Sequence, residues 1–397
     1  MILFANKNDQ STLEKVDMEL VALSVKTVSE KNRTKIKNIV KDSLKSFFVC
    51  FLLLLTKKEH QTVYIAIVPC GGIGDVVRQK AAVEELFLLF RHVVIDIYGR
   101  RYKFLFGDFK NIRFFADKNA IKLTRKKYDI VLDYATSNVT SGIANLTMNN
   151  LRNGDLKRFF SDFKKIKQEF QYCFNVKNQF LFQKEAIRNN LRFTDVVKLT
   201  TGIKNFKKSN LKLDYTERDI VKFGLSKSCK YITFQHGYGF EKNVRSKIGW
   251  RTKIWETKNW ERLFKNIKAS CTDYKIVQVG ISSDLIGETE INLVGKTSFD
   301  DLCSVMKYSS LHIDADCGCM HIAKALNVKS VILFGPSSAK YIGYDTNINI
   351  VSGLCSDCYT IRGWELRCLR NLEKPLCMSS ISPDFVAEVI LKYLKNL

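Results

Sequence analysis

The chain is 397 residues long, which exceeds one ordinary hydrophobic core and suits two domains. Its content of 46% hydrophobic and 12% aromatic residues is typical of a folded protein and excludes an intrinsically disordered chain. Lys and Arg outnumber Asp and Glu by 64 to 40, which gives a formal net charge of +24. An excess of this size indicates an anionic partner: a nucleic acid, an anionic membrane or a phosphorylated substrate.

Residues 1–60 are predicted to form a basic N-terminal extension. The charged and apolar residues predict a helix over residues 31–45, and the apolar run Phe47–Leu55 follows it. This run is far shorter than the ~20 residues that cross a bilayer as a helix, and no secretory signal opens the chain. The 12 cysteines are therefore expected to stay reduced in a cytoplasm. Two interpretations of the extension fit: a helix lying on an anionic membrane surface, or a solvated helix beside a buried strand.

From residue 62 onward the pattern changes to alternating strands and helices. Near-continuous apolar runs predict buried parallel strands at Val63–Val68, Val93–Tyr98, Ile130–Leu132, Tyr231–Phe234, Lys275–Val279, Leu311–Ile313 and Ser330–Phe334. Helices are expected at about Val76–Phe90, from Trp260, at Phe299–Met306, from about Met320 and from Asp384, with a basic helical stretch over residues 151–208. This alternation predicts an α/β protein with two Rossmann-like, doubly wound domains, 61–212 and 213–397, and a ligand cleft between them.

A glycine loop, Pro69–Asp75, connects the first predicted strand to the first helix. Its three glycines let the backbone turn tightly and let a substrate approach, and the helix N-terminus favours anions; they are Gly71, Gly72 and Gly74. The loop is neither a dinucleotide fingerprint, since Val77 stands at the next glycine position, nor a Walker loop. Asp75 fits two interpretations: a helix N-cap, or a functional carboxylate that faces the cleft.

Two further motifs lie in the second domain. Asp316, Gly318 and His321 stand between a strand and a helix, where they suit hydrogen bonding to sugar or ribose hydroxyls. The cysteines within this string do not have the spacing of a usual closed metal site. Lys253 precedes a predicted helix and is placed to bind a phosphate, although it is also simply one of 64 basic residues.

The order of these motifs resembles glycosyltransferase family 9, the ADP-heptose:lipopolysaccharide heptosyltransferases. The matching segments are GGIGDVV, YDIVLDY, KIWETKNW, VGKTSFDDLCSVMKYSSLHIDADCGCMHIAKALNVKSVILFGPSS and a cysteine-bearing tail ending CMSSISPD. Together they span roughly residues 62–390, and the block from Leu293 to Ser338 is the most specific. The first 60 residues and most of residues 140–225 match no family pattern.

The resemblance implies a GT-B fold and an inverting transferase that needs no catalytic metal. It assigns the catalytic base to Asp75, contact with the donor phosphates to Lys253, and donor-sugar binding to Asp316, Gly318 and His321. These roles suit the chemistry, because transfer with inversion needs a base on the acceptor hydroxyl. The departing nucleotide diphosphate gains negative charge that a lysine and helix N-termini stabilise.

The chain departs from the family pattern at two places. Cys317 stands where the family usually has Thr or Ser, so a hydroxyl donor to the ligand is lost. The family's His-Pro-Gly loop appears as Gln235-His236-Gly237, without the proline.

The tail carries a four-cysteine segment over residues 355–377. Its members are Cys355, Cys358, Cys368 and Cys377. Four thiolates suit one tetrahedral structural ion, and separate thiols or a disulfide pair are the alternatives. The protein heptosyltransferases of bacterial autotransporters are similar in this region and use a bound iron, so the resemblance implies structural zinc or iron here.

The function expected from these features is transfer of a heptose, or a related sugar, from an ADP-sugar to a lipopolysaccharide core acceptor. The enzyme would be cytoplasmic and peripheral on the anionic inner face of the bacterial inner membrane. Transfer of heptose to an autotransporter protein is the alternative within the same class. A basic nucleic-acid-binding protein is the alternative from a different class, favoured by the charge but by no recognisable module, so no nucleic acid is expected as partner.

Overall fold

The computed structural model of the chain describes residues 62–397 except for 107–110, 116–120, 122–124, 135–143, 175–178, 206–210, 238–251, 282 and 360–367. The predicted basic helix and apolar run of the N-terminal extension lie outside the described residues. In the part that is described, no helix is both long and apolar enough to cross a membrane.

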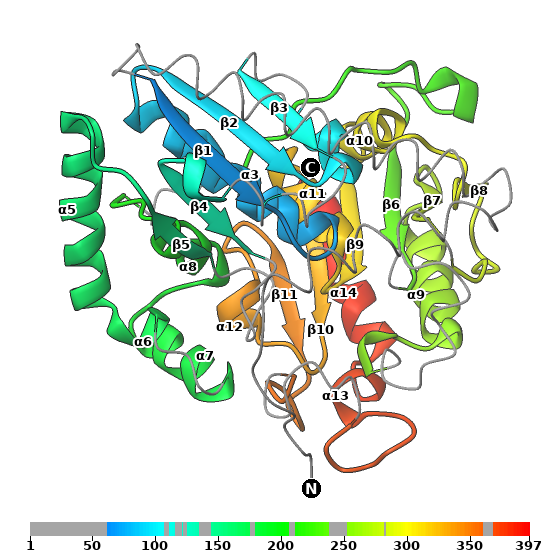
Figure 1. The fold of residues 1–397 in the computed structure, drawn as a ribbon. Helices are drawn as coiled ribbons and strands as arrows, with labels where there is room; N and C mark the ends of the chain where they lie inside the picture. Colours follow the sequence, from blue (N-terminus) through cyan, green and yellow to red (C-terminus); the bar gives the residue numbers. More distant parts are fainter. Residues whose placement is uncertain are drawn as a thin grey trace, which may run out of the picture.

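The first sheet has five strands in the order β3-β2-β1-β4-β5 (Figure 1). They are β1 (Val63–Val68), β2 (Val93–Tyr98), β3 (Ile112–Phe115), β4 (Ile130–Asp133) and β5 (Asn145–Met148). The central strand β1 runs parallel to β2 and β4, with Ile65 opposite Ile95 and Ile130. Only the edge strand β5 is antiparallel to its neighbour. The glycine loop therefore leaves the carboxyl end of the central strand.

The second sheet is wholly parallel, in the order β11-β10-β9-β6-β7-β8. Its strands are β6 (Tyr231–Gln235), β7 (Lys275–Val279), β8 (Ile291–Asn292), β9 (Leu311–Ala315), β10 (Ser330–Phe334) and β11 (Ile348–Val351). The strand order reverses beside β6 and β9, so the carboxyl ends of these two strands mark a ligand-binding crevice.

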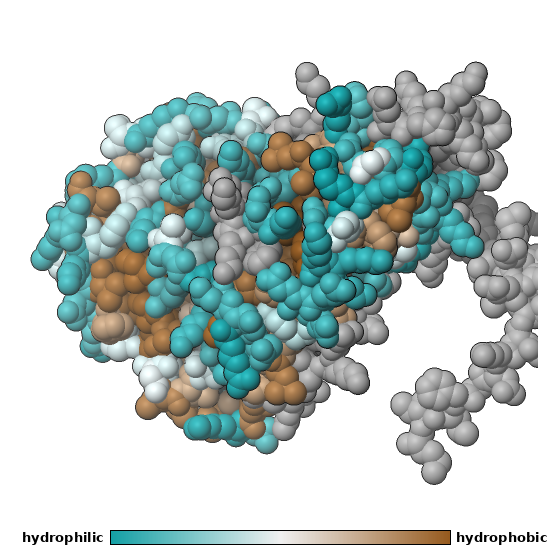
Figure 2. Space-filling view, turned by 90° about the vertical axis from the view of Figure 1, so that its left-hand side faces the viewer, coloured by the Kyte–Doolittle hydropathy of each residue, from teal (hydrophilic) through white to brown (hydrophobic). Residues whose placement is uncertain are grey.

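Helices cover both sheets (Figure 1). Those of the first half are α3 (Ile73–Leu89), α5 (Gly154–Glu169), α6 (Gln171–Phe174), α7 (Gln179–Arg188) and α8 (Phe193–Thr200). Those of the second half are α9 (Thr257–Ser270), α10 (Phe299–Lys307), α11 (Gly318–Ala325), α12 (Ala339–Ile342), α13 (Leu376–Ser379) and α14 (Pro383–Leu394). The 3₁₀ turns are η1 (Arg100–Leu105), η3 (Arg125–Lys127) and η4 (Val221–Phe223). The side of the molecule toward α5 is largely hydrophilic, with apolar patches between (Figure 2).

The predicted α/β class with doubly wound sheets is confirmed, and all seven predicted strands are present.

The predicted N-cap role of Asp75 is wrong. The helix begins at Ile73, three residues earlier than predicted, so Gly72 is the N-cap and Asp75 lies in the first turn. The glycine-rich first turn lacks the apolar period that marks the rest of the helix. The domain boundary near residue 212 stays a prediction.

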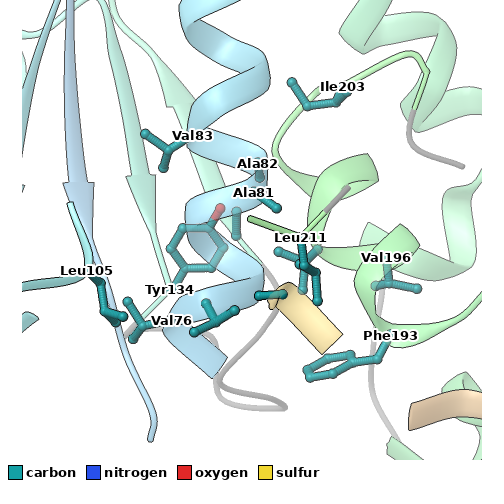
Figure 3. Packing of buried hydrophobic residues seen from close by; sticks show 14 of the residues in the cluster. Val76, Ala81, Ala82, Val83, Leu105, Tyr134, Phe193, Val196, Ile203 and Leu211 are labelled. Carbon is teal, nitrogen blue, oxygen red and sulfur yellow. The ribbon is translucent and has the colours of Figure 1, made fainter. Parts of the chain in front are cut away.

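One hydrophobic cluster runs from the first sheet across to helices of the second half. It contains side chains of β1 and α3 together with Met320 and Ile322 of α11. Within it, Val76 and Val83 of α3 lie toward Leu105 and Tyr134, and Ala82 lies on the side of Leu211 (Figure 3). Fully burying one such large side chain contributes about 1.5–3 kcal/mol, so the shared cluster fixes α3 and α11 against each other.

Gly74 marks the closest approach of these two helices. A Cβ built on Gly74 would lie 2.2 Å from Cδ2 of His321 and 3.2 Å from Cα of Gly318. The His321 ring cannot yield easily, because it is buried and its Nδ1 is 2.6 Å from the hydroxyl of Tyr344. Only a residue without a side chain fits at this position.

We predict that Gly74→Ala lowers the free energy of unfolding by about 1–3 kcal/mol, since the methyl group overpacks the contact between the helices. Thermal or denaturant unfolding measures the change. Gly154→Ala is the matched control: it also lies in the first turn of a helix, and its Cβ would meet nothing within 4 Å. Equal stability of the two variants would contradict the contact.

Candidate active site

The glycine loop is shaped around the side chain of Asp75. Gly71 has φ +100°, and a Cβ there would lie 2.3 Å from Asp75 Oδ2, so glycine is required for both reasons. The Gly72 amide donates to Asp75 Oδ2 at 3.0 Å. Tyr102 donates its hydroxyl to the Gly71 carbonyl at 2.6 Å, and Gln79 exchanges hydrogen bonds with the Cys70 backbone. The loop is therefore held in a fixed conformation beneath the carboxylate.

The other carboxylate oxygen of Asp75 is bonded to a residue of the same helix. Arg78 Nη2 donates to Asp75 Oδ1 at 2.6 Å. The Asp75 side chain keeps 22% of its surface exposed, whereas that of Arg78 keeps 6%. The carboxylate is thus oriented by two donors and still open to a ligand.

A buried ion pair lies just before the N-terminus of α11. Lys253 Nζ lies 2.6 Å from Asp316 Oδ2, and their side chains are 12% and 7% exposed. Burial opposes ionisation of Asp316, but the ammonium of Lys253 outweighs burial and lowers the pKa of Asp316 to about 2. The ammonium also lies 4.2 Å from the ring centroid of Tyr359. A charged lysine is therefore fixed where the carboxyl ends of the second sheet meet α11.

His321 joins the two halves. Burial, and then the positive charge of Arg78, lower the pKa of His321 well below its ordinary value, so the ring is neutral. Its Nδ1 is used by Tyr344, and its Cδ2 edge faces Gly74. Predicted as a donor ligand, His321 is also the side chain that fills the contact between α3 and α11.

Cys317 is turned inward. Its Sγ lies 2.8 Å from Asp314 Oδ2 and 3.1 Å from Gln235 Oε1, two acceptors that share the single thiol proton. Asp314 is fully buried, and burial raises its pKa despite the nearby imidazole of His312. The thiol thus lies against side chains at the carboxyl ends of β9 and β6.

The structure brings the predicted site residues into one neighbourhood. Tyr359 lies within electrostatic reach of residues from both halves: burial raises its pKa, Lys253 opposes the rise, and Asp316 and Asp75 add to it. His321 and the glycine loop meet at Gly74, as described above. Asp75 and the Lys253–Asp316 pair therefore stand on the two sides of the contact between the helices.

The four cysteines of the tail lie within electrostatic reach of one another. Burial raises the pKa of Cys358, and the neighbouring thiols of Cys355 and Cys368 raise it further. Burial and the same three thiols raise the pKa of Cys377 to about 12. Metal-binding geometry is not met by any group of three or more ligating side chains in the described residues. The donor chemistry fits a thiolate-bound ion, and the metal assignment stays a prediction.

Sequence reasoning missed three residues of the neighbourhood: Arg78, Tyr344 and Tyr359. Arg78 had a detectable signal, since it lies three residues after Asp75 on one helix, a spacing that brings opposite charges together. The two tyrosines are reached only through the tertiary fold.

The sequence profile of glycosyltransferase family 9 (heptosyltransferase) matches residues 118–363, more than half of the chain. The match includes Lys253, Asp316, Gly318 and His321. It begins after the glycine loop, so it does not include Asp75, and it ends before Cys368 and Cys377. No curated protein matches the chain in sequence.

Several solved structures share the fold. The iron-containing dodecameric glycosyltransferase TibC from enterotoxigenic E. coli H10407 has a TM-score of 0.57 and 14% identity, covering 84% of this chain and 76% of TibC. A family 9 glycosyltransferase from Veillonella parvula DSM 2008 has a TM-score of 0.51 and 18% identity, covering 83% and 97%. The E. coli ADP-heptose lps heptosyltransferase II has a TM-score of 0.51 and 15% identity, covering 84% and 100%. At these identities the likeness shows the fold alone, which is GT-B.

We predict that Lys253→Ala and Asp316→Ala each weaken binding of an ADP-sugar as well as turnover. The first removes the charge assigned to the phosphates, and the second leaves that charge buried without its carboxylate. Calorimetric titration with the ADP-sugar measures the affinity. Lys258→Ala, an exposed lysine five residues along the chain, is the control and should bind normally. Unchanged affinity in both site variants would overturn the assignment.

Proposed function

The chain belongs to glycosyltransferase family 9, the heptosyltransferases, and from this premise we propose that it transfers heptose from an ADP-heptose to a lipopolysaccharide core acceptor. That it is a glycosyltransferase follows from the family. The choice of donor is supported by a further TibC structure, solved in complex with ADP-D-beta-D-heptose, with a TM-score of 0.55.

The observation that carries the proposal is that Asp75 and the Lys253–Asp316 pair flank the same contact between α3 and α11. Asp75 is partly exposed and bonded to Arg78, whereas Asp316 is buried and paired with Lys253. Asp75 takes the proton of the acceptor hydroxyl while that oxygen attacks the anomeric carbon, and the bond to the diphosphate breaks on the opposite face with inversion. No metal takes part in this step.

The leaving group is stabilised from the second half of the molecule. Lys253 lies at the entrance to α11, and an ADP diphosphate would draw the ammonium from Asp316 toward its own oxygens. The positive end of α11 adds to this, and its first residue, Gly318, lets the ligand approach the backbone closely. Asp316 is then available to the sugar hydroxyls, and the donor-binding role of His321, a buried ring bonded to Tyr344, stays a prediction.

Two acceptors are compatible with this site. The lipopolysaccharide core is the leading one, because its phosphate groups suit a chain with a formal charge of +24. A protein acceptor is favoured by one observation, the four clustered cysteines, since the similar fold of TibC belongs to an iron-containing enzyme. Mass spectrometry of lipopolysaccharide and of surface proteins from a strain lacking this gene separates the two, since the missing sugar identifies the acceptor.

We further propose that the enzyme works on the anionic cytoplasmic face of the inner membrane. The basic extension of residues 1–60 is the expected contact. Its deletion should reduce sedimentation with anionic liposomes more than with neutral ones. Equal binding to both liposome types would contradict the proposal.

The four-cysteine segment would hold a structural zinc or iron ion through its thiolates. We predict about one equivalent of metal per chain by elemental analysis, and a lower melting temperature after chelation or in Cys358→Ser. Cys229→Ser, a cysteine outside the segment, is the control. Purified, active protein without metal and with four thiols that react with a thiol reagent would leave these residues as ordinary cysteines.

We predict that Asp75→Asn lowers kcat by roughly 10²–10⁴-fold, because general-base catalysis is lost, while affinity for the ADP-sugar stays nearly unchanged. Steady-state transfer assays and calorimetry measure the two quantities. Asp155→Asn is a matched control, since Asp155 is also an acidic residue in the first turn of a helix with an Arg three residues later. Normal turnover of Asp75→Asn would place the base elsewhere.

Thermal protection distinguishes the enzyme from a nucleic-acid binder. A ligand that binds the folded state raises the melting temperature, so ADP-heptose should protect the chain and oligonucleotides should not. Protection by oligonucleotides alone would favour the other class.

A further inference from the structure

Arg78 is a buried cation beside the partly exposed carboxylate of Asp75. It lies one turn after Asp75 on α3, and its Nη2 donates to Asp75 Oδ1 at 2.6 Å. The guanidinium carbon lies 4.1 Å from the ring centroid of Phe193, at the start of α8. A flat cation held against an aromatic face has little freedom to move. Arg78 is therefore held by Phe193 of α8 and oriented toward a carboxylate of its own helix, α3.

The burial of Arg78 is costly. Its Nε and Nη1 are buried and make no hydrogen bond to the described residues. Buried donors without partners on a charged group cost free energy that one ion pair does not fully recover. Burial of Arg78 therefore opposes stability, and the hydrogen bond that its side chain does make is the one to Asp75.

Arg78 also lies where the two halves meet. Its positive charge acts on His321, Tyr341 and Tyr344, all of which belong to the second half. The ring of Phe193 that holds Arg78 packs in turn against Tyr341 of the second half, with ring centroids 5.4 Å apart.

We propose that Arg78 is the positioning residue for the catalytic base. It holds Oδ1 of Asp75 while the Gly72 amide holds Oδ2, and together the two donors fix the rotation of the carboxylate toward the acceptor hydroxyl. Without Arg78 the carboxylate is held by one oxygen only and can rotate about its terminal bond, whose torsional preference is broad. This inference rests on the proposed role of Asp75 as the base.

Positioning has a distinct kinetic signature. Misplacement of a reacting group costs turnover, so Arg78→Met should lower kcat by roughly 10- to 100-fold while KM for donor and acceptor changes by less than about twofold. Arg78→Lys restores the charge without the rigid fork and should recover part of kcat. It also serves as the second variant if Arg78→Met does not fold.

Two controls separate positioning from support of the fold. Lys198→Met removes another buried cation of the first half, one paired with Glu85, and should lose stability with unchanged kcat. Arg158→Met removes an exposed Arg that has the same spacing to Asp155 as Arg78 has to Asp75. This variant should change neither the stability nor kcat. A loss of kcat in Lys198→Met equal to that in Arg78→Met would make Arg78 structural and overturn the proposal.

The remaining outcomes are equally decisive. Unchanged kcat in Arg78→Met, or a raised KM with unchanged kcat, overturns the proposal, the second because Arg78 would then bind a ligand directly. On the residual rate of Asp75→Asn, adding Arg78→Met should cause no further loss, because Arg78 acts through Asp75. A further loss of rate in the double variant would overturn the proposal. A fully active Asp75→Asn would instead remove the proposed base, whereas an inactive Asp75→Asn with a normal Arg78→Met would remove this inference alone.

Discussion

The close contact between the N-terminal ends of α3 and α11 is the constraint on which the site depends. Gly74 allows it, and the His321 ring fills it. Two helix N-termini that approach each other bring together two partial positive charges, which repel. A carboxylate stands at each end: Asp75 in the first turn of α3, and Asp316 just before α11. These carboxylates offset the repulsion, and the same geometry gathers both chemical roles into one place.

Each carboxylate has its own buried cation, and the two cations differ in kind. Lys253 is a compact ammonium on a flexible stem, beside the ring of Tyr359, and can exchange one oxygen partner for another. Arg78 is a planar fork held against Phe193, and suits a fixed orientation. This difference agrees with the proposed division of roles, in which the second half accepts the charge that develops on the diphosphate and the first half aims a base.

Strands that are buried on both faces could be predicted well from the sequence. The central strands of both sheets are continuous apolar runs, and β1, β2, β7 and β10 have the predicted bounds. The edge or short strands β3, β5, β8 and β11 were missed, because half-exposed strands of two to four residues lack such a run. Asp75, Lys253, Asp316 and His321 were predicted as site residues from motif order, and their roles stay predictions. Tyr344 and Tyr359 were not, since only folding brings them beside residues far away in the chain.

The replacement of a hydroxyl residue by Cys317 changes what α11 offers to a ligand. The thiol bonds to Asp314 and Gln235, and the side chain of this N-cap residue makes no bond to the first turn of the helix. The amides of that turn therefore lack the cap that Ser or Thr would supply. An anionic donor group bonded to those amides would replace the missing cap. Under the proposed function, the nucleotide-sugar thus completes α11 as well as reacting beside it, which couples donor binding to the order of the contact with α3.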